Sequence, residues 1–218
     1  MGCIASDQHD GYGTQETSRS LKPNPAEVDL SHFNLLGVLG QGGFGIVREC
    51  TKLSGLDSGK FYAIKCLSKK NVLRRSNGPT SVLMELEILA MLDSPFICNS
   101  HYAFQSPTTL FLVLDLARGG DMRFNMKCNP KNRFSESVSK FYISQLMLAL
   151  DCCHSLNILH RDVKPENLVM KSNGYIMLTD FGIAKILPDI EDCRGTSGTH
   201  GYMVKIKTSD PNSILTAH

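Results

Sequence analysis

The segment from Ser135 to Ser155 constrains the fold most, because its run FYISQLMLALDCC is apolar nearly all the way round a helix. Serine is a residue type that caps helix N-termini, so we expect a helix that begins after Ser135 and ends near Ser155. A helix without a polar face has to be enclosed by other parts of a protein. Little sequence remains to surround it here, so we expect part of this helix to stay exposed. The chain's 218 residues, 42% of them hydrophobic, are enough for one sizeable domain or two small lobes.

The region before this helix has the pattern of a β-sheet. Short β-type runs at residues 33–40, 45–51 and 60–67 are separated by glycine-containing turns, which favours an antiparallel meander. Residues 81–92 have apolar side chains at helical spacing, and two further apolar runs, at about residues 101–104 and 110–114, bring the number of expected strands to five. We expect a small sheet-rich lobe that leads through a flexible connector into a mainly helical part.

Composition excludes several classes of protein. A formal net charge of +2 gives no field of the kind that nucleic-acid-binding proteins carry, so we expect no nucleic-acid partner. The apolar runs fall far short of the roughly 18 residues of a membrane-spanning helix. The eight cysteines are scattered, with no CxxC pair and no secretory segment, which predicts reduced thiols in a cytoplasmic protein. The basic run KKNVLRR, residues 69–75, indicates a solvated connector rather than a membrane patch.

Residues 1–30 are polar and without apolar periodicity, which predicts a disordered arm. The first residues, MGCIAS, fit the M-G-x-x-x-S pattern of N-myristoylation, with Gly2 as the acceptor once Met1 is removed. One acyl chain binds membranes weakly, so stable attachment needs a second element, and Cys3 is the candidate palmitoylation site. A chance match to so short a pattern is the alternative. If both groups are attached, we expect the protein at the cytoplasmic face of a membrane.

A glycine motif, LGQGGFGIV, follows the pattern G-x-G-x-x-G-x-V. Glycine allows backbone to approach phosphates closely, because it has no Cβ. Taken alone, the motif is equally typical of an ordinary glycine hairpin and of a nucleotide site, and a Rossmann site would need a helix where a second strand follows here. The candidate nucleotide-binding residues in the motif are Leu39, Gly40, Gly42 and Gly45.

A lysine on the third expected strand strengthens the nucleotide interpretation. Lys65, in the run YAIK, is placed where a fixed ammonium reaches phosphates under the glycine hairpin. An acidic residue on the following helix would hold the ammonium extended. We expect Glu85 to be this partner, and Glu87 is the competing candidate.

Two further runs are decisive: LHRDVKPENLV, residues 159–169, and TDFG, residues 179–182. With the preceding motifs, they resemble the eukaryotic protein kinases, which have an H-R-D-x-x-x-x-N catalytic loop followed by a D-F-G metal loop. The resemblance implies an α+β, bilobal protein-kinase-like fold with a complete N-lobe and an incomplete, mainly helical C-lobe. The implied boundaries are an arm at 1–30, a kinase domain at 33–203 (N-lobe 33–115, hinge 115–121, partial C-lobe 122–203) and a non-homologous tail at 204–218.

The same resemblance implies a serine/threonine protein kinase that uses ATP and Mg²⁺ and acts on protein substrates. Asp162 would accept the proton of the attacking hydroxyl, and Lys164 would lie beside the γ-phosphate, as in kinases specific for Ser and Thr. Asn167 and Asp180 would hold magnesium, because hard oxygen donors suit a hard cation. Lys65 would anchor the α- and β-phosphates. Positioning and charge stabilisation are the main contributions that a protein makes to phosphoryl transfer.

The remaining nucleotide contacts are also implied by the resemblance. Adenine would lie between three apolar side chains, two hinge residues would offer it backbone groups, and a carboxylate would reach the ribose. In that order, the residues are Val47, Ala63 and Val169, then Asp115 and Ala117, then Asp121. Ordinary core packing is the alternative for the apolar three. The runs FLVLDLARGGDM and SPFI are similar to the AGC group of kinases, and the N-terminus is similar to the YANK branch.

The activation segment proceeds as in the family through GTSGTHGYM. Arg161 is the type of residue that pairs with a loop phosphate, so Thr196 and Ser197 are candidate phosphorylation sites. Thr199 matches a threonine that hydrogen-bonds near the catalytic aspartate. Where the family has Ala-Pro-Glu, this chain has VKI at 204–206, and we expect a chain truncated after the activation segment. An active kinase, a catalytically incompetent module that binds a nucleotide or a partner, and an unstable product all remain open.

Overall fold

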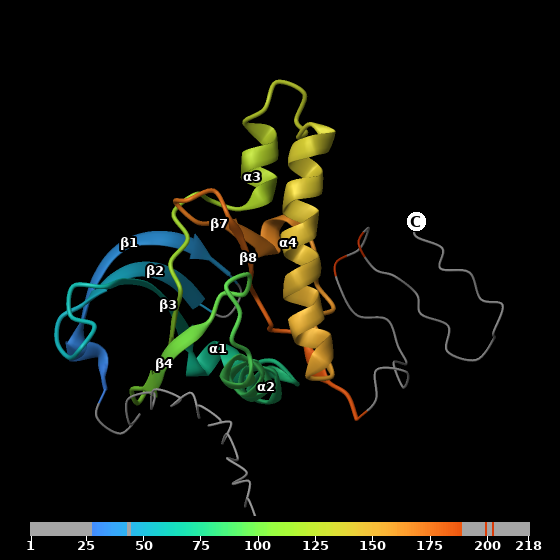
Figure 1. Ribbon diagram of the computed structural model, residues 1–218. Coiled ribbons are helices and arrows are strands. Elements are labelled where there is room, and N and C mark those ends of the chain that lie inside the picture. Colours follow the sequence, from blue (N-terminus) through green and yellow to red (C-terminus); the bar gives the residue numbers. More distant parts are fainter. Residues whose placement is uncertain (1–27, 43–44, 189–198, 200–201, 203–218) are drawn as a thin grey trace, which may run out of the picture.

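The computed structural model describes residues 28–42, 45–188, 199 and 202, and its ribbon is shown in Figure 1. The proposed acylation sites Gly2 and Cys3, the candidate phosphorylation sites Thr196 and Ser197, and the tail at 204–218 lie outside these residues.

The first lobe contains a five-stranded antiparallel sheet with the strand order β1-β2-β3-β5-β4. All five strands were predicted, and each lies within two residues of its expected position. The order also confirms the meander, since β1, β2 and β3 are consecutive neighbours. The strands are β1 (Phe33–Gln41), β2 (Gly45–Lys52), β3 (Phe61–Ser68), β4 (Ser100–Gln105) and β5 (Thr109–Leu114).

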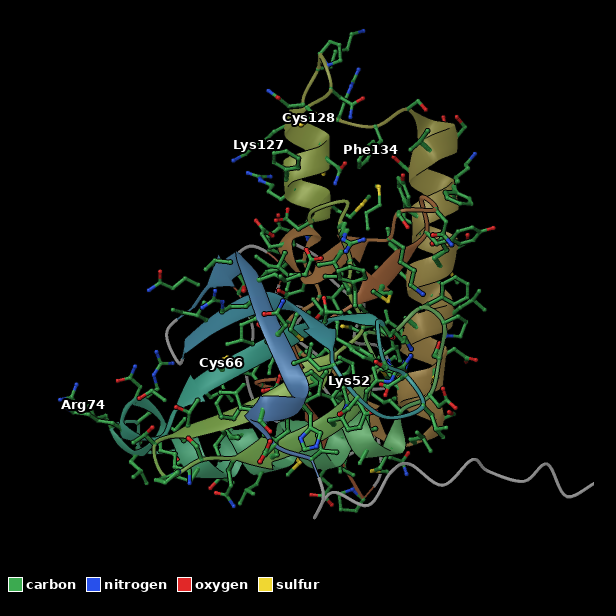
Figure 2. The ribbon with its side chains drawn as sticks, turned by 90° about the vertical axis from the view of Figure 1, so that its left-hand side faces the viewer. Lys52, Cys66, Arg74, Lys127, Cys128 and Phe134 are labelled. Atoms are coloured by element: carbon green, nitrogen blue, oxygen red, sulfur yellow. The ribbon has the colours of Figure 1, made fainter. Side chains whose placement is uncertain are left out.

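Two helices connect β3 to β4. Helix α2 (Gly78–Met91) begins three residues before the predicted start, because Pro79 is tolerated in the first turn of a helix. The expectation of a solvated connector at residues 69–75 is wrong in part, since Lys69–Leu73 forms the short helix α1. Val72 is buried there against Leu67 and Val82, and this apolar contact holds the turn in place. The basic side chains still point outward, as Arg74 shows in Figure 2.

The second lobe is built on α3 (Met122–Lys127) and α4 (Glu136–Ser155), which stand side by side in Figure 1. The predicted cap is confirmed, because the Val138 N–H donates to Ser135 Oγ at 3.4 Å. Phe134 lies between the two helices in Figure 2 and contacts the Tyr142 ring. Two short strand pairs and a 3-10 turn complete the described part of the lobe: β6 (Ile158–Leu159) with β9 (Lys185–Ile186), β7 (Leu168–Met170) with β8 (Ile176–Leu178), and the turn at Pro165–Asn167.

Only one face of α4 is covered by the described residues. Gln145, Ala149 and Cys153 are buried, and the helix packs against β6 and β8. Larger apolar side chains remain exposed, among them Ile143 at 55% and Met147 at 64%. The described elements supply neighbours along one side of the helix only, so the exposure expected from the sequence is found in this part of the chain.

The two lobes share one apolar core. It joins Ala63, Ile88 and Leu112 of the first lobe to Ala149 and Phe181 of the second. The segment after α2 is hydrogen-bonded directly to β8, because Cys98 N–H donates to Leu178 O at 2.9 Å and Leu178 N–H donates to Phe96 O at 2.8 Å. These bonds fix the end of β8 against the segment that joins α2 to β4, and Asp180 follows this strand end by two residues.

The described helices include none that is both long and apolar enough to cross a membrane. The six described cysteines are free thiols, as the sequence predicts for them.

Candidate active site

Three charged side chains from different elements meet between the lobes. Lys65 Nζ, from the middle of β3, lies 2.6 Å from Glu85 Oε1 of α2 and 3.6 Å from Asp180 Oδ1, which follows β8. Burial by itself lowers the pKa of Lys65, but Glu85 and Asp180 outweigh it, so the pKa lies above its ordinary value. The predicted Lys65–Glu85 pair is confirmed, and Glu87 points to solvent instead.

The carboxylate of Asp162 is held by a hydrogen-bond network. Lys164 Nζ donates to Oδ2 at 2.7 Å, and Asn167 Nδ2 donates to the same oxygen at 2.9 Å. Thr199 donates to Oδ1 through its backbone N–H and its hydroxyl, which confirms the predicted contact near the aspartate. Burial raises the pKa of Asp162, but the bonds from Lys164, Thr199 and Asn167 together lower it below its ordinary value. The carboxylate is therefore ionised at neutral pH and fixed in one orientation.

The amide of Asn167 has a defined orientation. Its Nδ2 donates both to Asp162 O, at 2.8 Å, and to Asp162 Oδ2, and both partners are acceptors. Within the described residues, the side-chain oxygen Oδ1 of Asn167 has no hydrogen-bond partner. Asp180 is half-exposed nearby, and Thr179 N–H donates to Asn167 O at 2.9 Å, which ties the two loops together. An amide oxygen and a carboxylate, completed by phosphate oxygens and water, fit magnesium.

A buried histidine, to which sequence reasoning assigned no role, aligns these loops. His160 Nδ1 accepts from Asp162 N–H at 3.2 Å, and its Nε2 lies 3.0 Å from Thr179 O. The ring also packs edge-on against Phe181. His160 thus joins the backbone N–H of Asp162 to the backbone carbonyl of Thr179, which precedes Asp180. The only signal in the sequence was its place in the H-R-D triplet.

The backbone is unusual at two positions in the loops of the candidate site. Arg161 and Asp180 have φ values of 65° and 64°, a region that side-chain-bearing residues adopt rarely. Arg161 Nε donates to Ile183 O at 2.7 Å, which compensates part of this cost and connects the two loops again.

The glycines of the hairpin have different structural roles. A Cβ on Gly45 would lie 1.8 Å from Cys66 O of β3, so the close approach of two strands requires glycine there. A Cβ on Gly40 or Gly42 would meet nothing within 4 Å. These two glycines leave open space, which is compatible with the predicted phosphate contact. Leu39 is 45% exposed beside them.

The residues expected around adenine are brought together. Ala63 belongs to the shared core, and Val47, Ala117 and Val169 pack against it. Asp115 is already engaged, because its N–H donates to Asn99 O at 3.0 Å and its carboxylate lies 2.7 Å from His101 Nε2.

Two further residues of the hinge, Ala117 and Asp121, were also expected to contact the nucleotide. Among the described residues, none forms a hydrogen bond with the backbone N–H or C=O of Ala117, so both groups remain available. Asp121 caps α3 by accepting from Phe124 N–H at 2.7 Å, and it also pairs with Val169 through a strand bridge. One carboxylate oxygen of Asp121 is therefore committed to the helix.

Comparison with known proteins agrees with this geometry. Residues 33–205 match the protein kinase domain. The chain is 44% identical over 184 residues to ribosomal protein S6 kinase alpha-1 of Homo sapiens, covering 84% of this chain and 24% of that protein. It is 34% identical over 201 residues to ribosomal protein S6 kinase beta of Caenorhabditis elegans, covering 92% of this chain and 35% of that protein. The chain thus spans about a quarter to a third of the length of these relatives.

A lysine paired with two carboxylates between two lobes, beside a fixed aspartate, is typical of one class of protein, the protein kinases, and the family match agrees with this. The chain belongs to the protein kinase domain family. The predicted bilobal fold is confirmed, and so is the predicted likeness to the AGC group, to which the S6 kinase relatives belong.

Proposed function

We propose that this chain transfers the γ-phosphoryl group of ATP to the hydroxyl groups of Ser and Thr residues in proteins. The observation that carries the proposal is the convergence of Lys65 with Asp180, next to a loop in which Asp162 is ionised and fixed. Positioned charges are what phosphoryl transfer requires from a protein.

In the proposed reaction, Asp162 accepts the proton of the attacking hydroxyl as its oxygen bonds to the γ-phosphorus. The bond to the β-phosphate oxygen breaks, and ADP leaves. Lys164, which donates to both Asp162 Oδ2 and Thr199 Oγ1, lies where an ammonium can offset charge on the transferred group. Asn167 and Asp180 would hold magnesium, which would supply neutralisation of charge on the phosphates. Lys65 is positioned by Glu85 to anchor the other phosphates.

The Ser/Thr preference rests on Lys164 and on the similarity to ribosomal protein S6 kinases. The proposed nucleotide contacts of Val47, Ala63, Ala117 and Val169 are supported by their packing in one core, and those of Gly40 and Gly42 by the open space beside them. Asp121 is bridged to Val169 of this group. For Leu39, Gly45 and Asp115 the proposed contacts rest on the resemblance of the motifs.

Phosphate transfer from γ-labelled ATP to a Ser/Thr peptide library tests the proposal. Asp162→Asn should lower transfer by roughly 10²- to 10⁴-fold and leave binding of Mg·ATP intact, because it removes the proton acceptor and keeps the shape. Asp151→Asn, an exposed carboxylate on α4, is the matched control and should transfer normally. Mg·ATP binding without any transfer would instead support the alternative of a nucleotide- or partner-binding module.

We also propose acylation of Gly2 and Cys3 as the basis for a membrane association of this kinase. The support is the sequence pattern MGCIAS alone. Metabolic labelling with alkyne analogues of myristate and palmitate should be lost in Gly2→Ala and in Cys3→Ser respectively. Thr196 and Ser197 are proposed as sites of activating phosphorylation, which mass spectrometry of active protein would test.

A further inference from the structure

The hinge connector carries an arginine that contacts the first lobe in two ways. Arg118 Nη2 donates to Glu49 Oε1 of β2 at 2.5 Å. The guanidinium carbon of the same arginine lies 4.5 Å from the centre of the Phe61 ring, at the start of β3. We call Arg118, Glu49 and Phe61 the hinge latch. The sequence predicted only a flexible connector here.

The partners of Arg118 lie on the face of the sheet that lines the nucleotide site. Antiparallel pairing places Glu49 opposite Ala63 and Val47 opposite Lys65. Side chains opposite one another, or two residues apart on one strand, project from the same face. Glu49 and Phe61 therefore share a face with Ala63 and Lys65. The hinge latch extends this face outward, immediately beyond the expected adenine position.

The residues directly after Arg118 are bound to the second lobe. Gly119 N–H donates to Met170 O, and Met170 N–H donates to Gly120 O, both at 2.8 Å. Asn125 Nδ2 also donates to Gly119 O at 2.7 Å. A Cβ on Gly119 would lie 2.8 Å from the Met170 side chain, so the connector and β7 are in close contact. The chain is thus attached to the second lobe at residue 119 and, through one side chain, to the first lobe at residue 118.

We propose that Arg118 is a positioning residue that holds the two lobes together at the adenine end of the cleft and thereby slows nucleotide release. The inference rests on the proposed nucleotide site. If the lobes separate at this end, Glu49 and Phe61 move away from Arg118 and the latch breaks. Ala117, whose backbone groups are available for adenine, directly precedes Arg118, so the latch also limits the movement of these groups.

Both contacts are partly exposed, which sets the size of the effect. The side chains of Arg118 and Glu49 are 50% and 20% exposed, so salt and water weaken the ion pair. Stacking of a planar guanidinium on an aromatic ring adds to the stabilisation that the ion pair gives. From the two contacts together, we expect loss of the latch to accelerate nucleotide release by about fivefold. Lysine forms the ion pair but stacks less well, so Arg118→Lys should give an intermediate rate.

The test is the dissociation rate of a fluorescent ADP analogue from the full chain in the presence of Mg²⁺. Arg118→Ala should release the analogue about fivefold faster than the unaltered chain, with little change in melting temperature. The double variant Glu49→Arg with Arg118→Glu should recover part of the loss, because it restores an ion pair with the charges exchanged. Arg133→Ala, an exposed arginine in the loop between α3 and α4, is the matched control and should not change the rate.

Hydrogen exchange of the nucleotide-free protein gives a second readout. Exchange at the Met170 amide, which bonds to Gly120 O, should be faster in Arg118→Ala and unchanged in Arg133→Ala. Unchanged release and unchanged exchange in Arg118→Ala would overturn the proposal. If the unaltered chain bound no nucleotide, the proposed function would fail, and the exchange measurement alone would then decide whether the latch exists.

Discussion

At the scale of single residues, the ammonium of Lys65 depends on its buried partner. Its side chain is 18% exposed, and that of Glu85 is 6% exposed, so neither charge is well hydrated. A buried charge that loses its partner keeps the cost of desolvation. The Lys65–Glu85 pair should therefore matter for stability as well as for phosphate binding, in contrast to ion pairs on the surface such as Lys140–Glu136.

Glu85→Gln should lower the free energy of unfolding by about 2 kcal/mol, because Lys65 then retains only the longer contact to Asp180. Glu87→Gln offers a matched control two residues along the same helix, where the side chain is exposed and little change is expected. Urea unfolding of the two variants makes the comparison. Equal losses in both would show that the pair contributes nothing.

His160 should make stability depend on pH. Burial is the main cause that lowers the pKa of His160, and its Nδ1 already accepts from Asp162 N–H, which leaves no place for a second ring proton. The unfolded chain takes up that proton as pH falls below about 6.5, whereas the folded chain does not. Stability is thus present above this pH and is lost below it, by up to about 1.4 kcal/mol per pH unit.

Urea unfolding between pH 7.5 and 5 measures this slope. His160→Phe should be less stable at pH 7.5 but should show a shallower slope than the unaltered chain. His154→Gln, which changes an exposed histidine at the end of α4, should keep the original slope. An identical slope in His160→Phe would contradict the assignment.

At the scale of elements, the close pairing of β2 with β3 limits which residues can replace glycine in the hairpin. Gly45→Ala places a methyl group 1.8 Å from Cys66 O, so the strands must separate. We expect a loss of about 2 kcal/mol in unfolding free energy. Gly40→Ala meets open space and should change stability by less than about 0.5 kcal/mol. Similar melting temperatures for the two variants would refute this distinction.

At the scale of the whole molecule, the described part of α4 presents apolar side chains to solvent. Ile143 and Met147 lie one turn apart on the same exposed side. Changing both to Lys should reduce binding of an apolar-surface dye and leave the unfolding midpoint nearly unchanged, because neither side chain contributes to the core. Ala149→Lys, at a position 1% exposed, should instead prevent stable folding. A large loss of stability in the double variant would indicate that this face is covered.

The sequence by itself determined most of the local structure and named the residues that the structure brings together in the candidate site. Glycine spacing, strand alternation and the capping serine act over a few neighbouring residues, so the five strands, the start of α4 and the H-R-D and D-F-G loops could be predicted. The choice of Glu85 over Glu87 followed from spacing and was correct.

The tertiary structure alone decided contacts between residues distant in the chain. The short helix α1 depends on burial of Val72 against Val82, and the hinge latch joins Arg118 to Glu49 across 69 positions. The role of His160 likewise requires two loops to meet. Such contacts depend on how the lobes pack against each other, and no periodicity along the chain encodes them. The same holds for α4, since its composition indicated only that it needs neighbours, and the arrangement of the described elements showed which face they cover.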